Sequence, residues 1–444
     1  MLTYLLRLII FVCTVFRKKN YRASRSVEGN SADFAKGESF WWAYKHFISA
    51  IEEPEPGKGI EEYFLSHAPV FSAPPEFKAK NTVVISAGGD IMPTSYLNSQ
   101  TAAHFFDDVS QLLFSSDLCC MNLEAPLDTG KPLGLPGKNI VKPPAMNLSE
   151  ELFDLYWRGG TGVAFYSTAN NHSMDMGEEG LIKTLDFLDK KKAAHVGTAR
   201  TPGERDDIPV LTVGGIRVAQ LAYTFSLNRQ KTPDGKEYMA NLVRVNRPDC
   251  DISLILRHIG IAKKKGADLI IANIHWSLEY ESFPIQNVID MGHRLLESGA
   301  DIILGNHPHT LQTAERYEWN DQASGKKKNG LILYALGNIS TVETPVKNSS
   351  LAGLAGITVQ KGELAGEQRT LITDAKLLPV YHYLRLSNNQ CLEARLLNLG
   401  RLDEQISTGQ CPYALTAKQK ANIARLRRLA ERLMPYAFKG LQKK

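Results

Sequence analysis

Five apolar runs of this chain each end in side chains that can bind a metal ion or move a proton. The runs, with the polar residues that close or follow them, are 82–87 with Asp90, 118–123 with Asn122 and Glu124, 163–167 with Asn170, Asn171 and His172, 269–274 with His275, and 302–304 with His307 and His309. Segments with apolar residues at helical spacing separate several runs, and a glycine typical of a helix C-terminus, Gly266 or Gly299, precedes two of them. Helices alternating with buried strands predict an α/β domain.

Side chains at the carboxyl ends of neighbouring strands come together in space although they lie far apart in the sequence. Buried carboxylates and imidazoles carry a large desolvation cost unless they are paired or bound to a cation. Asp and Asn are also common caps and turn formers, which is the alternative interpretation for any one of these residues alone. Their recurrence at five strand ends favours a metal or ligand site at one edge of a sheet.

The segment 305–309 carries two of these histidines with a single proline between them. Gly305 allows a sharp turn after the strand, and Pro308 fixes one backbone dihedral, so both imidazoles are held with little freedom. Neutral imidazole is a common ligand of zinc and iron. The pattern predicts a metal site, with a surface loop as the alternative.

Composition indicates a globular protein without identifying its partner. The chain has 444 residues, 43% of them hydrophobic, which is enough for one large or two ordinary domains. The net charge of +5 is small and both signs are interspersed, so we expect no nucleic-acid partner. The six cysteines contain no Cys-x-x-Cys pair and do not settle the redox compartment. The expected divisions are an N-terminal apolar segment and linker (1–38), a helical lead-in (39–80), the main domain (81–386) and a basic helical tail (387–444).

Both ends of the chain leave alternatives open. Residues 1–16 are apolar apart from Arg7, and three basic residues follow, which fits a membrane-associated anchor, an unprocessed leader or a cleaved export signal. The tail from Thr416 has apolar residues on one helical face and basic residues around it. We expect this face to pack on its own domain, with a membrane surface as the alternative.

Six motifs lie in order between Thr82 and Thr344, at 89–92, 122–127, 169–177, 275–280, 305–312 and 334–338. In these motifs the chain resembles the CapA family of bacterial capsule and poly-γ-glutamate synthesis proteins, which carry a PGA_cap domain and are related to calcineurin-like metallophosphatases. The resemblance implies a four-layer α/β/β/α sandwich with a metal site at one edge.

The resemblance also implies two divalent ions, of Mn, Fe or Zn, and roles for individual residues. Asp90 would bind the first ion, Glu124 would bridge the two, and Asn171 would bind the second and take part in catalysis. His172 would contact the substrate as an acid or orienting group. The residues that would complete the metal shell are His275, His307 and His309.

The chain departs from the family pattern at two positions. Met92 stands where metallophosphatases usually have a histidine, and methionine is a poor ligand for these metals. This departure bears on whether the first metal position is fully occupied. Ser277 stands where the family commonly has glycine.

Further residues near the site are expected to contact the substrate. They are Asn122, Asn170, Trp276, Glu279, Lys131, Lys138 and Lys142. The three lysines lie among Gly and Pro residues in the loop 128–146, next to Glu124, and would form a wall that receives an anionic substrate. A solvated loop is the alternative.

These features favour a metal-dependent hydrolase of capsule or poly-γ-glutamate synthesis that attacks a phosphoester or a γ-glutamyl bond. One alternative, favoured by Met92, is a non-catalytic polymer-binding or scaffold component; another is a general metallophosphodiesterase. The expected partners are an anionic polymer or phosphoester, a polymer-synthesis complex and a membrane. The expected location is the cell envelope, with membrane association through the N-terminus, and the cytoplasm is the alternative.

Overall fold

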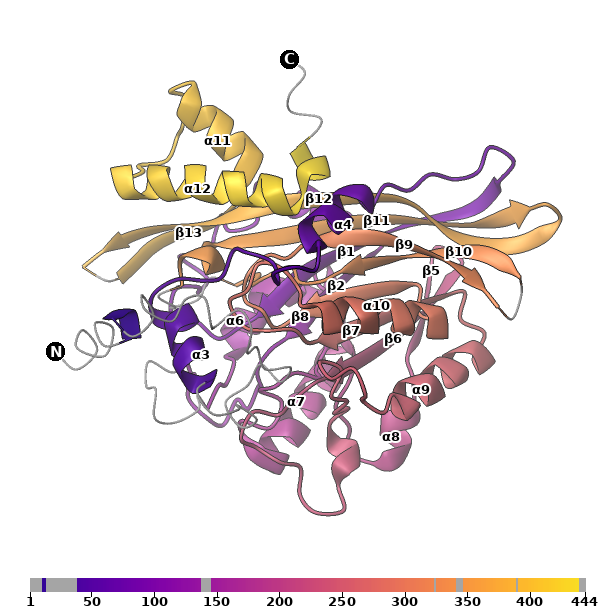
Figure 1. Cartoon of the computed structure of the whole chain (residues 1–444). Helices are drawn as coiled ribbons and strands as arrows, with labels where there is room; N and C mark the ends of the chain where they lie inside the picture. Colours follow the sequence, from indigo (N-terminus) through magenta and orange to yellow (C-terminus); the bar gives the residue numbers. More distant parts are fainter. Residues whose placement is uncertain are drawn as a thin grey trace.

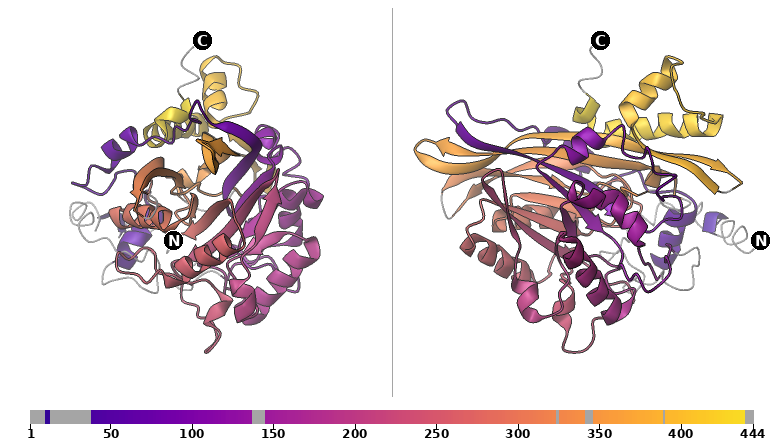
Figure 2. Two further views of the ribbon diagram at one scale, coloured as in Figure 1. Left: turned by 90° about the vertical axis from the view of Figure 1, so that its right-hand side faces the viewer. Right: turned by 180° about the vertical axis from the view of Figure 1, so that it is seen from behind.

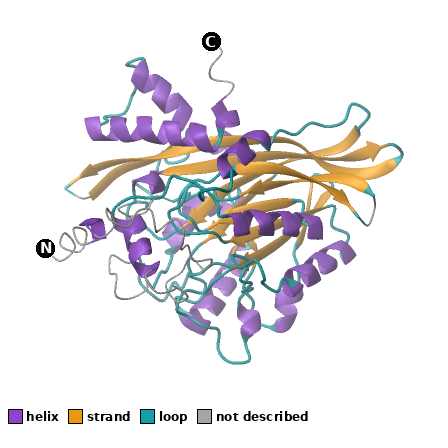
Figure 3. Ribbon diagram, viewed as in Figure 1, coloured by secondary structure: helices purple, strands orange, loops and turns teal. Residues whose placement is uncertain are grey.

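The computed structural model of the chain describes residues 10–12, 38–136, 145–322, 325–340, 346–388 and 390–438 (Figure 1). The strands of these residues form two sheets (Figure 3). The first has the order β13 (Gln390–Asn398), β12 (Glu367–Ser387), β11 (Leu351–Leu364), β1 (Lys78–Ile91), β2 (Leu118–Leu123), β3 (Phe165–Ser167), β4 (Ala194–Val196). The second has the order β5 (Val210–Val213), β6 (Ile216–Thr224), β7 (Leu269–His275), β8 (Ile302–Asn306), β10 (Lys326–Leu333), β9 (Ala314–Asp321).

Each sheet has a parallel centre. Strands β1 to β4 pair in parallel, as do β6, β7, β8 and β10, whereas β11 to β13, β5 and β9 join antiparallel. The predicted runs are confirmed as β1, β2, β3, β7 and β8. Strand β13 continues the first sheet beyond Leu386, the position where the sequence suggested that the main domain ends. Parallel strands require long crossover connections, and helices supply them.

The two sheets face each other across one hydrophobic core. Side chains of both sheets belong to this core, among them Ile85 of β1 and Leu221 of β6. In β2, Cys120 points into it, while Met121 points to the opposite face and belongs with Phe153 to a second core. This alternation follows from the two-residue period of a strand. The first sheet is therefore buried on both faces.

Helices cover the outer faces of the sandwich. The helices are α3 (Glu38–Phe47), α4 (Ile60–Ser66), α5 (Ser110–Phe114), α6 (Glu150–Trp157), α7 (Gly177–Lys191), α8 (Pro202–Asp206), α9 (Ser253–Lys264), α10 (Gln286–Ser298), α11 (Leu399–Ser407) and α12 (Ala417–Leu433), with short 3-10 turns at Arg158–Gly160, Glu237–Met239, Lys347–Ser350 and Pro435–Phe438. Helices α6 and α7 lie on the first sheet, and α9 and α10 on the second (Figures 1 and 2). Helix α10 ends at Gly299 with φ 118°, as the glycine predicted. The predicted α/β/β/α layering is confirmed.

The C-terminal helix α12 packs against the first sheet rather than extending away from it (Figure 1). Thr416 caps its first turn, and Ile423 and Leu426 are fully buried in the core that also contains Tyr381 of β12. The prediction that its apolar face packs on its own domain is confirmed.

Helix α12 also binds the segment that follows α3. Arg425 forms an ion pair with Glu52, and Arg432 pairs with Glu53 at 2.9 Å and with Glu61 at 2.5 Å. The C-terminal helix thus holds the N-terminal lead-in against the sandwich.

None of the helices in the described ranges is long and apolar enough to cross a membrane. Residues 1–16, for which the sequence left three alternatives open, lie outside the described residues apart from 10–12, and so do residues 17–37.

Candidate metal centre

Predicted ligands from both sheets meet where the parallel strands end. Strands β1 and β2 place Asp90 opposite Asn122, and β7 and β8 place His275 opposite Asn306. The turn after β8 brings His307 back to the first sheet, where its backbone N–H donates to Asp90 Oδ2 at 3.2 Å. The centre therefore lies between the two sheets at one edge of the sandwich.

Two overlapping sets of three ligands form this centre. One set contains Glu124, His307 and His309, and the other contains Asp90, Glu124 and His275. Within each set, one ligand atom from each residue lies within 4.8 Å of the others, and all of these side chains are buried. Carboxylates with imidazoles are a ligand set that suits a divalent metal ion.

Glu124 is common to both sets, and neither of its oxygens has a hydrogen-bond partner among the described residues. Its Oε1 lies 3.4 Å from His275 Nε2 and 3.6 Å from His309 Nε2. Burial, and then the charge of Asp90, raise the pKa of Glu124 well above its usual range. A fully buried carboxylate is costly unless a cation neutralises it, so these residues fit a metal ion.

Asp90 is buried beside Glu124 and accepts a hydrogen bond from Asn122 Nδ2 at 2.7 Å. Burial raises the pKa of Asp90 to about 6, although the hydrogen bonds from Asn122 and the His307 backbone act in the opposite direction. Asn122 is therefore placed to orient a ligand carboxylate.

His307 has both ring nitrogens buried and without a hydrogen-bond partner in the described structure. Burial, followed by the neighbouring His309, lowers the pKa of His307 well below its usual range, so the ring is in the neutral form that binds metals. The backbone at His307 and His309 has φ values of 102° and 54°, a region that side chains rarely adopt. Backbone strain of this kind clusters at functional sites.

His309 is held by the amide of Asn338, which lies in the predicted motif 334–338 but was assigned no role. The Nδ1 of His309 lies 2.9 Å from Oδ1 of Asn338, which follows β10. An N–H on Nδ1 donates to this oxygen, and the other nitrogen, Nε2, remains on the side of Glu124. The position of Asn338 after an apolar run is the signal that could have identified it.

Asn171 reaches the centre through His275. Its Oδ1 lies 3.0 Å from His275 Nε2, and its Nδ2 donates to Asn228 Oδ1 at 3.4 Å. Two ligands that each lie about 2.1 Å from one ion stand at such a separation. The structure thus brings Asn171 into the predicted constellation.

His172 is paired with a carboxylate three residues later. Its Nδ1 lies 2.7 Å from Asp175 Oδ2, which also accepts the backbone N–H of Met146 at 2.8 Å. Asp175 lies in the predicted motif 169–177 but was assigned no role. Asn170 shapes the loop: its Nδ2 donates to the Leu123 carbonyl at 2.7 Å, and its Oδ1 accepts the N–H of His172 at 3.0 Å.

The structure does not gather all expected substrate contacts around the ligands. Trp276 is fully buried, and its indole N–H donates to the Tyr334 carbonyl at 3.0 Å, so its side chain is part of the hydrophobic core. The Glu279 carboxylate accepts a hydrogen bond from Trp42. Lys131 is 42% exposed and pairs with Asp128 at 3.7 Å. Lys138 and Lys142 lie outside the described residues.

Met92 and Ser277, where the chain departs from the family pattern, differ in their surroundings. Met92 is buried but belongs to neither ligand set, and Ser340 Oγ bonds its backbone N–H and carbonyl at 2.6 and 2.9 Å. Ser277 has φ 72°, a conformation that glycine adopts without strain, which explains why glycine suits this position.

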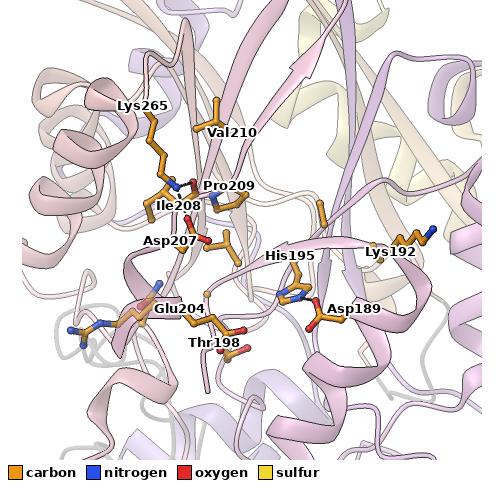
Figure 4. A pocket seen from close by; sticks show the side chains of 16 residues that line it. Asp189, Lys192, His195, Thr198, Glu204, Asp207, Ile208, Pro209, Val210 and Lys265 are labelled. Atoms are coloured by element: carbon orange, nitrogen blue, oxygen red, sulfur yellow. Dashed lines mark hydrogen bonds and ion pairs between the residues drawn. The ribbon is translucent and has the colours of Figure 1, made fainter. Parts of the chain in front are cut away.

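A cavity of about 500 Å³ lies elsewhere, between β4 and the segment that leads into β5 (Figure 4). Four of its charged or titratable side chains form two pairs. Lys265 lies 2.5 Å from Asp207, and His195 lies 3.1 Å from Asp189. No group of metal ligands was found here among the described residues.

Two curated relatives match this chain over about three fifths of its length. Capsule biosynthesis protein CapA of Bacillus anthracis is 29% identical over 279 residues, which are 60% of this chain and 61% of that protein. PGA biosynthesis protein CapA of Bacillus subtilis (strain 168) is 28% identical over 272 residues, 60% of this chain and 65% of that protein. The match thus spans less than two thirds of either relative.

One solved structure aligns along most of the chain at low similarity. It is the crystal structure of calcineurin-like phosphoesterase YfkN from Bacillus subtilis, with a TM-score of 0.36 and 13% identity over 81% of this chain and 99% of that one. A TM-score of this size carries no argument about the site.

Residues 84–341, more than half of the chain, match the family described as Bacterial capsule synthesis protein PGA_cap. This range contains both ligand sets and the residues that orient them. The chain belongs to the PGA_cap family of bacterial capsule synthesis proteins.

Proposed function

We propose that this chain is a metal-dependent hydrolase of surface-polymer synthesis that acts in the cell envelope. The proposal rests on Glu124. The carboxyl group of this residue is buried and belongs to both ligand sets, and none of the described residues donates a hydrogen bond to it. Unsatisfied buried groups are rare in folded proteins, and a bound cation is a direct explanation for this one.

Two divalent ions fit the charge of the centre. Glu124 lies in the electrostatic field of three other carboxyl groups, those of Asp90, Glu279 and Asp175, each of which raises its pKa. Asp90 and Glu124 are the carboxyl groups of the two ligand sets, and these sets, which share Glu124, offer two positions for ions. Mn, Fe and Zn are the candidates, because these metals accept mixed oxygen and nitrogen ligands.

Such ions would supply a nucleophile at neutral pH and stabilise charge on the oxygens of the reacting group. The residues of the chain would orient the substrate and move protons. His172, held through Nδ1 by Asp175, has its other ring nitrogen for proton transfer to the leaving group. Asn171 would hold its carbonyl oxygen toward the reacting centre, because Asn228 binds the other end of its amide.

The substrate is proposed to be an anionic surface polymer or its phosphoester precursor. The printed names of the two relatives, capsule biosynthesis and PGA biosynthesis, support this class. A phosphoester and a γ-glutamyl amide both develop negative charge on oxygen during hydrolysis, so one centre can attack either bond. The lysine-rich loop 128–146 is proposed as the wall that receives the anion.

Elemental analysis of purified protein tests the metal centre first. Wild type is expected to contain Mn, Fe or Zn near two ions per chain, and Asp90→Ala and His307→Ala to contain much less. Asp207→Asn, in the paired cavity, is the matched control and should keep the metal. Loaded protein is then assayed on phosphodiesters and on poly-γ-glutamate. If wild type binds no metal even when Mn or Zn is supplied, the proposal of a metal-dependent hydrolase is refuted.

Met92 supports a second candidate, a polymer-binding or scaffold protein without turnover. Methionine, a poor ligand for these metals, occupies the position where metallophosphatases have histidine. Metal-loaded protein that binds the polymer but releases no product would favour this candidate. A gain of activity in Met92→His would show that the missing ligand is the cause.

A further inference from the structure

An N-terminal element outside the family-matched residues 84–341 packs against the metal centre. The segment that follows α3 runs beside the loop after β7: the Ile51 N–H donates to the Tyr280 carbonyl at 2.9 Å, and the Ser282 N–H donates to the Ile51 carbonyl at 2.8 Å. Residues more than 200 positions apart therefore lie side by side.

Three side chains on one face of α3 each bind one of three successive loop residues. Trp42 donates to Glu279, Lys45 Nζ lies 2.9 Å from Glu281 Oε1, and His46 Nδ1 lies 3.2 Å from the hydroxyl of Tyr280. Positions i, i+3 and i+4 share a helix face, which explains how a single helix holds the whole loop.

The pair of Lys45 and Glu281 is buried, with relative exposures of 6% and 1%. A buried ion pair is retained at a desolvation cost, and it fixes the geometry of both partners. Lys45 also contributes to the lowered pKa of His307, and His46 to that of His309, so α3 lies within electrostatic range of the ligands.

The loop in turn supports the turn that carries two ligands. The Tyr280 N–H donates to the Pro308 carbonyl at 2.8 Å, and Thr310 Oγ1 donates to the Glu281 carbonyl at 3.0 Å. The Tyr280 ring lies 5.9 Å from that of His309. Tyr280 has φ 60°, and such strained residues persist only where their surroundings hold them.

We propose that α3 is a positioning element of the metal centre, and that Trp42 and Lys45 set the affinity for the ion that His309 binds. The inference rests on the proposed metal centre. It assigns a role in metal binding to a segment that the family match does not contain. Outer residues that orient ligands typically change metal affinity by about 10- to 100-fold.

The test compares full-length Trp42→Phe, Lys45→Met and Lys45→Arg with wild type. Binding of Mn²⁺ and of Zn²⁺ is titrated by calorimetry after treatment with a chelator. In Trp42→Phe and in Lys45→Met, the affinity for one of the two ions is expected to fall about tenfold, and the affinity for the other ion should stay near the wild-type value. Lys45→Arg, which keeps the ion pair, should restore most of the loss.

Lys191→Met is the matched control, because Lys191 forms ion pairs with Glu150 and Asp154 away from the centre. It should leave both affinities unchanged even where the unfolding temperature falls. If Lys45→Met does not fold, the test rests on Trp42→Phe, because this substitution keeps an aromatic ring and removes only the indole N–H donor. Wild-type affinity in Trp42→Phe, or an equal loss in Lys191→Met, overturns the inference while the metal centre stands. Wild type that binds no metal refutes the centre and the inference together.

Discussion

The metal centre and the cavity beside β4 differ in whether their polar and charged side chains have partners. In the cavity, acids and bases sit in pairs, such as Lys265 with Asp207, and the side chain of Asp207 is 77% exposed. In the centre, Glu124 is fully buried and lacks a hydrogen-bond donor among the described residues, and both ring nitrogens of His307 lack a partner.

This difference separates two kinds of charged region: one in which opposite charges are paired and one in which buried polar groups lack partners. A set of charges that satisfy one another is already at low energy, and a ligand must displace existing pairs to bind there. A set of buried groups without partners is at high energy until a cation arrives. Substitutions in either region test this difference.

Replacing Glu124 by Gln should have the largest effect. Metal content is expected to fall to background, because both ligand sets lose their shared carboxylate. The metal-free protein should at the same time gain stability at neutral pH, because the amide, unlike the acid, cannot become a buried negative charge. Elemental analysis and urea unfolding in the presence of chelator measure the two effects. Retention of metal, or a loss of stability, would contradict the interpretation of Glu124.

Replacing Asn338 by Ala should weaken metal binding about tenfold without abolishing it. The amide oxygen of Asn338 lies 2.9 Å from His309 Nδ1 and selects the tautomer that leaves Nε2 for the metal. Titration with Zn²⁺ measures the change. Ser349→Ala, a buried hydroxyl that bonds the Val346 carbonyl, is the control and should bind metal as wild type does.

Without metal, the stability of wild type relative to Asp90→Asn should fall as the pH rises from about 4 to about 6. The pKa of Asp90 is raised from 3.8 to about 6 in the folded state, so the folded protein holds this proton more tightly than the unfolded chain. The contribution of this bound proton to the free energy of unfolding is complete below pH 4 and is lost as Asp90 ionises. Excess metal should reverse the trend, because metals bind the ionised carboxylate. Thermal unfolding of wild type and of Asp90→Asn across this range tests the sign, because the difference between the two proteins isolates the Asp90 carboxyl group.

Replacing Asp207 by Asn in the cavity should have the smallest effect. The pair with Lys265 is largely exposed, and exposed pairs contribute about 0–1 kcal/mol. Metal content should stay at the wild-type level. A large loss of metal or activity would show that the cavity and the centre are coupled and would remove the basis of the comparison.

The sequence was sufficient to predict the convergence of Asp90, Glu124, His275 and His309. Each lies at or just after the end of a strand, and parallel strands bring their carboxyl ends to one edge whatever their separation in the sequence. The layering followed from the same alternation of helices and strands.

Other contacts could not be predicted, because no local pattern encodes them. The pairing of Lys45 with Glu281 joins residues 236 positions apart, and neither residue lies in a periodic segment that points to the other. Trp276 follows a strand directly, where the two-residue period no longer fixes the direction of a side chain, and it turned into the core. The strand β13 was missed because its burial is mixed, with exposed and buried residues interspersed.

The ion pairs between α12 and the N-terminal lead-in have a consequence for synthesis of the protein. Arg425 and Glu52 are 373 residues apart, so their contact forms only after α12 has been synthesised. The segment 51–53, next to α3, is then secured last. If α3 positions the metal ligands, a nascent chain still on the ribosome would hold the metal weakly, and full loading would follow release. The order of synthesis would thus delay metal loading until α12 is in place.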